Sequence, residues 1–123
     1  MQIVDANIIL RYLLKDNEVL YEKAKIILEQ QDIFVPYEVV AEIIYVLEKV
    51  YDVAKGEISS TVDKLCRYKN LNFFSKQTVI KSLEYYSTYN LDYVDSLLCA
   101  YKSEEDHEIL SFDEKLLKTL KKI

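Results

Sequence analysis

QIVDANIILRYLL, residues 2–14, is the stretch that decides the fold, because a β-rich run passes directly into a helix. The apolar residues at 2–4 favour a short buried strand, and those at 8–14 recur with the spacing of a helix. Asp5 stands at the turn between the two. The stretch therefore predicts a strand that leads into a helix, with a carboxylate at the carboxyl end of the strand.

The same succession of strand and helix recurs along the chain. Short β-rich runs occupy residues 2–4, 33–35, 71–74 and 108–112. Helical apolar spacing is found at residues 8–14, 19–30, 37–51, 57–68, 77–89, 93–103 and 114–122. Strands that alternate with helices predict a parallel sheet with right-handed crossovers and helices on both faces. We therefore expect one α/β domain that spans residues 1–123.

Composition limits the class of protein. The chain has 123 residues, half of them hydrophobic and 30% charged, as expected for one folded domain with a core. No segment approaches the roughly 20 uncharged residues of a membrane helix. Asp5 and Arg11 interrupt the apolar N-terminal stretch, which argues against a secretory signal, so we expect a cytoplasmic protein. The net charge of −5 argues against wide, non-specific coating of nucleic acid.

Several chemistries are excluded by residues that the sequence lacks. With a single glycine, Gly56, the chain cannot form a Walker loop or a G-x-G-x-x-G turn. With a single histidine, His107, it cannot use a two-histidine nuclease mechanism, and Cys66 and Cys99 are too few for a structural zinc site. We expect both cysteines to be reduced core residues, with a disulfide as the alternative. Any bound metal must therefore be held by oxygen.

Four acidic residues stand where a parallel sheet would gather them, since functional groups in such sheets lie beyond the carboxyl ends of the strands. Asp5 and Asp113 directly follow the first and fourth predicted strands. Asp95 falls in the first turn of a predicted helix, and Glu42 borders the apolar stripe of another. Each of these four residues can also be explained by its local structure, without a shared site. Helix capping explains the aspartates, including Asp92 beside Asp95, and a solvated edge position explains Glu42.

Taken as a set, these carboxylates favour a metal site. Two carboxylates about 4 Å apart repel by roughly 4 kcal/mol at an effective dielectric of about 20, so a converging set needs a cation or a proton. Ligands that are all oxygen indicate Mg²⁺ or Mn²⁺. Such an ion can activate water and stabilise a leaving oxygen in phosphodiester hydrolysis. Hydrolysis of a nucleic acid is therefore the chemistry that the set favours.

The sequence resembles the PIN-domain ribonucleases, and more closely the VapC-type toxins of toxin–antitoxin pairs. The resemblance spans nearly the whole chain and rests on the motifs IVDANIILRYLL (3–14), VAEIIYVL (40–47), LDYVDSLL (91–98) and ILSFD (109–113). It implies a three-layer α/β/α fold with a central, mostly parallel sheet of four or five strands. Ala6 and Ser111 depart from the pattern, since threonine is common at both positions.

The resemblance also implies roles for individual residues. The catalytic and metal-binding residues would be Asp5, Glu42, Asp95 and Asp113. Supporting polar groups would be Asn7, Ser111 and Asp92. Among the basic residues, the candidates for contact with RNA are Arg11, Lys15 and Lys49. The family likeness further implies an endoribonuclease that uses Mg²⁺ or Mn²⁺, forms a homodimer and is inhibited by a cognate antitoxin protein.

Two other functions stay open at this point. A receiver-like signalling domain also binds magnesium at strand ends, but it normally has an adjacent acidic pair after the first strand, which Asp5-Ala6-Asn7 does not supply. A PIN-like binding module without catalytic activity, acting only through a partner, fits the same residues. The sequence alone does not separate this module from a nuclease.

Overall fold

A computed structural model describes residues 1–123, in which short strands alternate with helices as the sequence predicts. The strands are β1 (Gln2–Ile3), β2 (Ile33–Phe34) and β3 (Leu71–Asn72). The helices are α1 (Ala6–Leu14), α2 (Glu18–Gln30), α3 (Tyr37–Lys49), α4 (Lys55–Cys66), α5 (Lys76–Thr88), α6 (Tyr93–Glu105) and α7 (Glu114–Leu120). All seven predicted helices are present. None of them has the length and apolar composition that a membrane span needs.

Side-chain caps set where most of the helices begin. Asp5, Asn17, Ser75, Asp92 and Asp113 each accept a hydrogen bond from the backbone N–H three residues further on. Such a bond satisfies one of the donors that a first helical turn leaves unpaired, and it contributes about 1 kcal/mol. The capping role considered for the aspartates is therefore confirmed.

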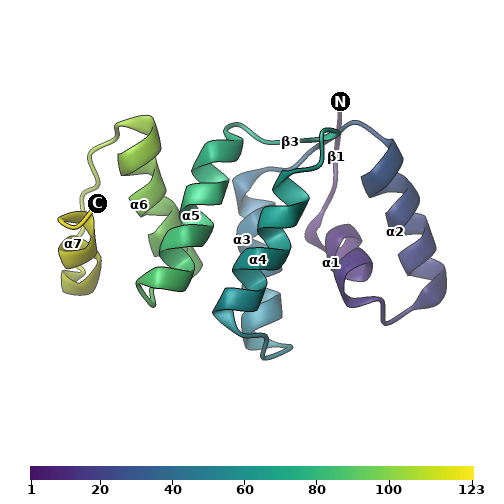
Figure 1. Ribbon diagram of the computed structural model, residues 1–123, viewed down its shortest axis with the longest axis horizontal. Coiled ribbons are helices and arrows are strands. Elements are labelled where there is room, and N and C mark those ends of the chain that lie inside the picture. Colours follow the sequence, from purple (N-terminus) through teal and green to yellow (C-terminus); the bar gives the residue numbers. More distant parts are fainter.

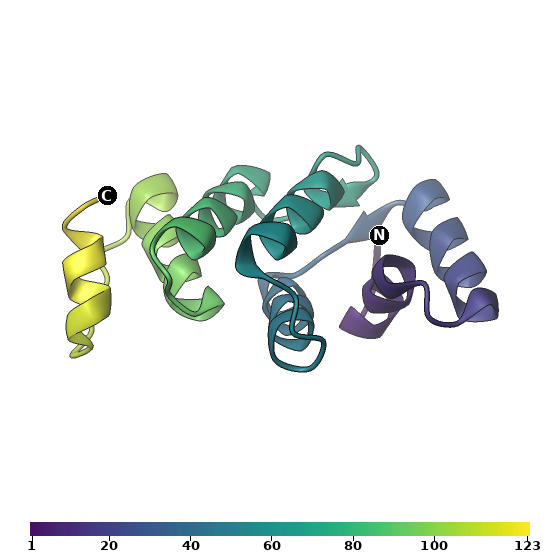
Figure 2. The same ribbon diagram turned by 60° about the horizontal axis from the view of Figure 1, so that its bottom comes forward.

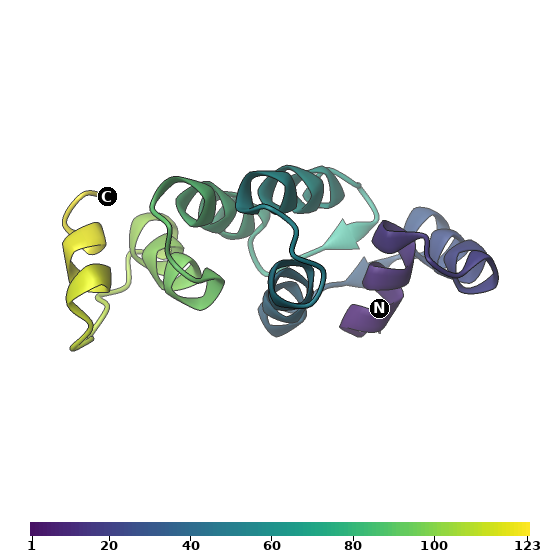
Figure 3. The same ribbon diagram turned by 90° about the horizontal axis from the view of Figure 1, so that it is seen from below.

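The sheet is parallel, with the strand order β1-β2-β3. Gln2 pairs with Ile33 and Ile3 with Phe34, and the same two residues of β2 pair with β3 on their other side. Figure 3 shows this sheet between the α1–α2 pair and the α3–α4 pair. Because β1 lies at an edge, one side of it has no neighbouring strand.

The expected fourth strand at residues 108–112 is not formed, so the expected sheet of four or five strands has only three. No backbone hydrogen bond joins these residues to the rest of the chain. Leu110 is 87% exposed and Phe112 is 103% exposed. A β-rich segment becomes a strand only where another strand edge receives it, and α5 and α6 carry this segment away from β1 (Figure 1).

Two apolar clusters hold the chain together. The larger has 22 buried residues from the sheet and from α1 to α6, with Leu28, Ile33 and Leu71 at its centre completely buried. The smaller has six buried residues and fixes α7 against α5 and α6. Figure 2 shows α7 at the far end of the row of helices, so α7 is attached to the sheet only through the helices between them. Cys66 and Cys99 are free and buried, as expected.

Asn70 links the end of α2 to the sheet. Its Nδ2 donates hydrogen bonds to the carbonyl oxygens of Leu28 at 2.6 Å and Gln31 at 2.7 Å. The backbone carbonyl oxygen of Asn70 accepts a hydrogen bond from the backbone N–H of Ile33 at 2.9 Å. One side chain therefore supplies donors to two carbonyls where a helix ends, beside the central strand.

Replacing Asn70 with alanine should lower the free energy of unfolding by about 1 to 3 kcal/mol, because part-buried carbonyl groups lose their donor. Urea unfolding followed by circular dichroism measures the change. Gln30→Ala is the control, since Gln30 is exposed at the end of α2, and it should change stability by less than about 0.5 kcal/mol. Equal unfolding midpoints for the two variants would contradict the role assigned to Asn70.

Candidate active site

The four acidic candidates lie on different elements, and the structure does not bring them to one point. Asp5 precedes α1, and Glu42 is exposed on α3. Asp95 is half-buried in the first turn of α6, and Asp113 is exposed just before α7. No three His, Cys, Asp or Glu side chains are close enough together to hold a metal ion. In this arrangement the residues therefore do not fit a divalent ion.

The N-terminal end of α6 is nevertheless an acidic centre. Burial raises the pKa of Asp95, and the negative charges of Asp92 and Asp113 raise it further, whereas Lys115 opposes the shift. The backbone N–H of Asp95 donates a hydrogen bond to Oδ1 of Asp92 at 2.9 Å. Asp92 and Asp113 thus lie near enough to act electrostatically on Asp95, although they come from different segments of the chain.

Asp113 reaches this centre through the connection between α6 and α7. Its backbone N–H donates to Oγ of Ser111 at 3.0 Å, and its Oδ1 accepts from the backbone N–H of Leu116 at 2.9 Å. Lys115 Nζ donates to the carbonyl oxygen of Asn90 at 2.7 Å, which ties α7 to the loop that precedes α6. Ser111 therefore helps to fix the backbone at Asp113.

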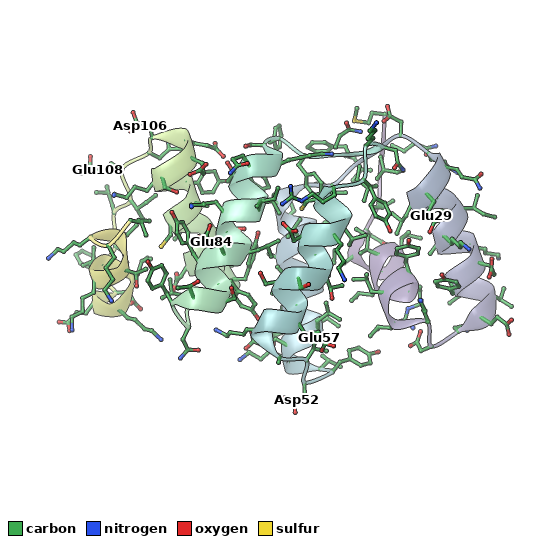
Figure 4. The ribbon with its side chains drawn as sticks, viewed as in Figure 1. Glu29, Asp52, Glu57, Glu84, Asp106 and Glu108 are labelled. Atoms are coloured by element: carbon green, nitrogen blue, oxygen red, sulfur yellow. The ribbon has the colours of Figure 1, made fainter.

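Asp5 stands apart from the acidic centre. Its Oδ1 accepts a hydrogen bond from the backbone N–H of Ile8 at 3.2 Å, and Asn7 beside it is exposed. Figure 4 labels Glu108, at the start of the unpaired segment. The helices α3, α4 and α5 lie between Glu108 and β1. The segment that leads to Asp113 is therefore remote from the strand that leads to Asp5.

The basic candidates for RNA contact have local partners. Arg11 Nη1 donates to both carboxylate oxygens of Asp16, at 2.8 and 3.0 Å. Lys49 Nζ lies 3.0 Å from a carboxylate oxygen of Glu48, and its side chain is 59% exposed. Lys15 is exposed at the end of α1. Of the three, Arg11 is the one held by a bidentate contact, whereas Lys15 and Lys49 face solvent.

Glu105, which lies at the C-terminal end of α6, is a polar residue of the surface that no sequence motif indicates. Its Oε2 accepts hydrogen bonds from Thr78 Oγ1 at 2.8 Å and from the Tyr37 hydroxyl at 3.3 Å. An open groove of about 740 Å³ lies beside it. A signal for this feature is present in the sequence, because Leu97, Tyr101 and Glu105 recur every four residues and so share one face of a helix.

Comparison with known proteins assigns the family. The model of the PIN domain family matches residues 3–122. Comparison with curated proteins and with solved structures gives no match. PIN domains are generally nucleases, most often ribonucleases, and they generally use divalent metal ions. Since the match leaves out only the first two residues and the last, the chain belongs to the PIN domain family.

Proposed function

We propose that this protein is a metal-dependent endoribonuclease and the toxin of a type II toxin–antitoxin pair. The observation that carries the proposal is the PIN family match over residues 3–122. The acidic centre at Asp92, Asp95 and Asp113 supports it, because the negative charges of Asp92 and Asp113 add to burial in raising the pKa of Asp95, and a carboxylate in such a place suits a site that takes up a cation. The proposed ligands of Mg²⁺, or of Mn²⁺ as a substitute, are Asp5, Glu42, Asp95 and Asp113.

Assembly of this site requires residues 108–112 to join the sheet. β1 has an unpaired edge, and residues 108–112 make no backbone hydrogen bonds. Ile3 is 65% exposed, Leu110 is 87% exposed and Phe112 is fully exposed. A free strand edge and an unpaired β-rich segment are complementary, because pairing would satisfy backbone groups and cover apolar side chains. We infer that residues 108–112 add to β1 as a fourth parallel strand.

This pairing would carry Asp113 to the side of Asp5. Asp113 directly follows residues 108–112, and Asp5 follows β1 with only Val4 between them. Neighbouring parallel strands end at the same edge of a sheet. If Asp5 and Asp113 lie level, Ser111 lies opposite Ile3. Pairing within one chain is favoured over pairing with a second copy, since it loses no translational freedom.

The partners in this proposal are an RNA substrate, a second copy of the chain and a cognate antitoxin, with the reaction taking place in the cytoplasm. A net charge of −5 suits an inhibitor with a basic segment. The alternative is a PIN-like binding module without catalytic activity. The lack of three carboxylates close enough to share an ion favours that alternative.

Incubation with structured RNA and Mg²⁺ should produce cleavage that a chelator abolishes. Asp5→Asn and Asp95→Asn should each lower the initial rate at least about 100-fold, because each removes a proposed metal ligand. Denaturing gels measure the rate. Asp63→Asn is the matched control, since Asp63 lies on α4 and pairs with Arg67, and it should keep the wild-type rate. If cleavage continues with the chelator and in both site variants, a contaminating nuclease is its source. That result would support the non-catalytic alternative.

Although Asp95→Asn should lower the cleavage rate, it should stabilise the fold. It should raise the free energy of unfolding by about 0.5 kcal/mol at pH 7 without divalent ions. The gain is small because solvent screens the half-buried carboxylate and because asparagine interacts more weakly with the helix dipole. Burial and two negative charges raise the pKa of Asp95 in the folded state, so the charged form carries a penalty. That penalty fades as the pH falls through the raised pKa and is absent below the unfolded value of about 3.9.

Urea unfolding at pH 7 and near pH 3.5 should therefore show a difference between Asp95→Asn and wild type at the higher pH only. Glu104→Gln, an exposed change on the same helix, is the control for removal of one charge. A variant that is less stable than wild type at both values of pH would contradict the electrostatic account.

Ile3→Cys combined with Ser111→Cys should form a disulfide within one chain, because neighbouring strands hold Cα atoms within disulfide range. Cys66 and Cys99 are buried and free, so they should not compete. Non-reducing gels and mass spectrometry of peptides detect the link. Ile3→Cys with Val19→Cys is the control, since Val19 is exposed on α2. A link found only between two chains, or equally in the control, would contradict the inferred pairing.

A further inference from the structure

A pocket of about 290 Å³ lies where the second half of α3 faces the first turn of α6. Its inner wall is apolar, since Ile44 and Tyr93 are buried. At its border, Tyr45 is 63% exposed and Val94 is 57% exposed. An apolar pocket with a few polar groups at its border is the usual form of a site for a small ligand. This pocket is therefore a candidate for a flat, largely apolar ligand group.

Two carboxylates line the pocket, and only one of them has a free oxygen. Glu48 accepts a hydrogen bond from the Tyr86 hydroxyl through Oε1, and its Oε2 lies 3.0 Å from Lys49 Nζ. Asp92 accepts the backbone N–H of Asp95 through Oδ1, whereas no hydrogen bond engages its Oδ2. An ionised carboxylate accepts hydrogen bonds and donates none. The pocket therefore offers one free carboxylate oxygen, from Asp92, to a donor on a ligand.

Lys49 brings a positive charge to the border of the same pocket. Its side chain is 59% exposed, so the ammonium group is accessible to a ligand even though it pairs with Glu48. The hydrogen bond and the negative charge of Glu48 raise the pKa of Lys49, and the charge of Asp92 adds a smaller contribution. Lys49 on α3 is therefore near enough to Asp92 on α6 for their charges to interact across the pocket.

We propose that this pocket holds one unpaired base of the RNA substrate and selects a base with an exocyclic amino group, such as cytosine. Tyr45 offers an exposed ring for stacking, Asp92 accepts from the amino group, and Lys49 contacts phosphate at the border. Uracil fits poorly, because it has a carbonyl oxygen where cytosine has the amino group, and two acceptors repel. This inference rests on the proposed function, since it takes RNA as the ligand.

The pocket adjoins the acidic centre through Asp92, which belongs to both. The charge of Asp92 acts on Asp95, a proposed metal ligand. A base held at Asp92 therefore brings the neighbouring phosphodiester close to the proposed reaction site. Binding energy from the base is then available to position the bond that reacts. The pocket would in this way decide which nucleotides are cleaved.

Fluorescence anisotropy with the whole protein tests the proposal, using labelled hexamers of cytidine and of uridine in EDTA. The cytidine hexamer should bind about 10-fold more tightly, as expected for one base-specific hydrogen bond to a carboxylate. Equal affinities would overturn the proposal. Because binding is measured without divalent ions, the result does not depend on cleavage. Equal affinities with chelator-sensitive cleavage would overturn the base preference alone, whereas a preference without cleavage would support the pocket and contradict the nuclease.

Asp92→Asn tests how the base is recognised. Asparagine caps a helix as well as aspartate does, so the hydrogen bond from the N–H of Asp95 is kept. The amide group replaces the free acceptor with a donor, which suits the carbonyl of uracil. The variant should therefore bind the uridine hexamer at least as tightly as the cytidine hexamer. Asp63→Asn, which removes the same charge on α4, should keep the wild-type preference. An unchanged preference in Asp92→Asn would overturn the proposal.

Tyr45→Ala should weaken binding of both hexamers about 10-fold, because stacking on an aromatic ring tolerates any base. Tyr51→Ala is the matched control, since Tyr51 is an exposed tyrosine that does not line the pocket, and it should keep the wild-type affinity. Thermal unfolding confirms that each variant is folded, and sedimentation measures its oligomeric state. If Tyr45→Ala separates a dimer and leaves RNA binding unchanged, a second copy of the chain covers the pocket, and the proposal is overturned.

Discussion

The parallel pairing of β2 with β1 on one side and β3 on the other is the contact on which the rest of the structure depends. Each strand has only two paired residues, so the ladder itself contributes few hydrogen bonds. The sheet persists because Ile33 and Leu71 are buried among helices, with Leu28 completing their packing. Beyond β3, the helices are positioned relative to the sheet by their packing on one another and by the contact of Phe74 with Phe34 of β2. The edge of β1 is left without a partner.

Helix capping and ligand binding are compatible uses of the same aspartates. Asp5, Asp92 and Asp113 each accept a backbone N–H through Oδ1, and no other hydrogen bond engages their Oδ2 atoms. The cap therefore orients the carboxylate and leaves one oxygen for another contact. Asp95 differs, because its side chain accepts no hydrogen bond and its pKa is raised by burial and by neighbouring charge. An acidic centre of this kind opposes folding and favours a bound cation.

Helix α6 has a different chemical character at each end. Its N-terminal turn carries Asp92 and Asp95, whereas its C-terminal turn places Glu105 against Tyr37 and Thr78. The two ends differ in what they can attract. The first gathers one exposed and one half-buried carboxylate near Asp113, and the second combines one fixed carboxylate with aromatic rings. One helix therefore carries an acidic turn at its N-terminal end and an aromatic groove at its C-terminal end.

The sequence by itself determined the seven helices, the aspartates that cap three of them and the first three strands, because each depends on residues a few positions apart. Asp5 and Asp92, for example, each cap a helix by accepting a hydrogen bond from the backbone N–H three residues later. Tertiary structure decided whether residues 108–112 become a strand and which carboxylates come together. A strand needs a partner edge that is remote in sequence, and nothing local specifies that edge, so Leu110 and Phe112 have the pattern of a strand without its pairing. The groove at Glu105 likewise depends on Tyr37 and Phe74, which only folding brings beside α6.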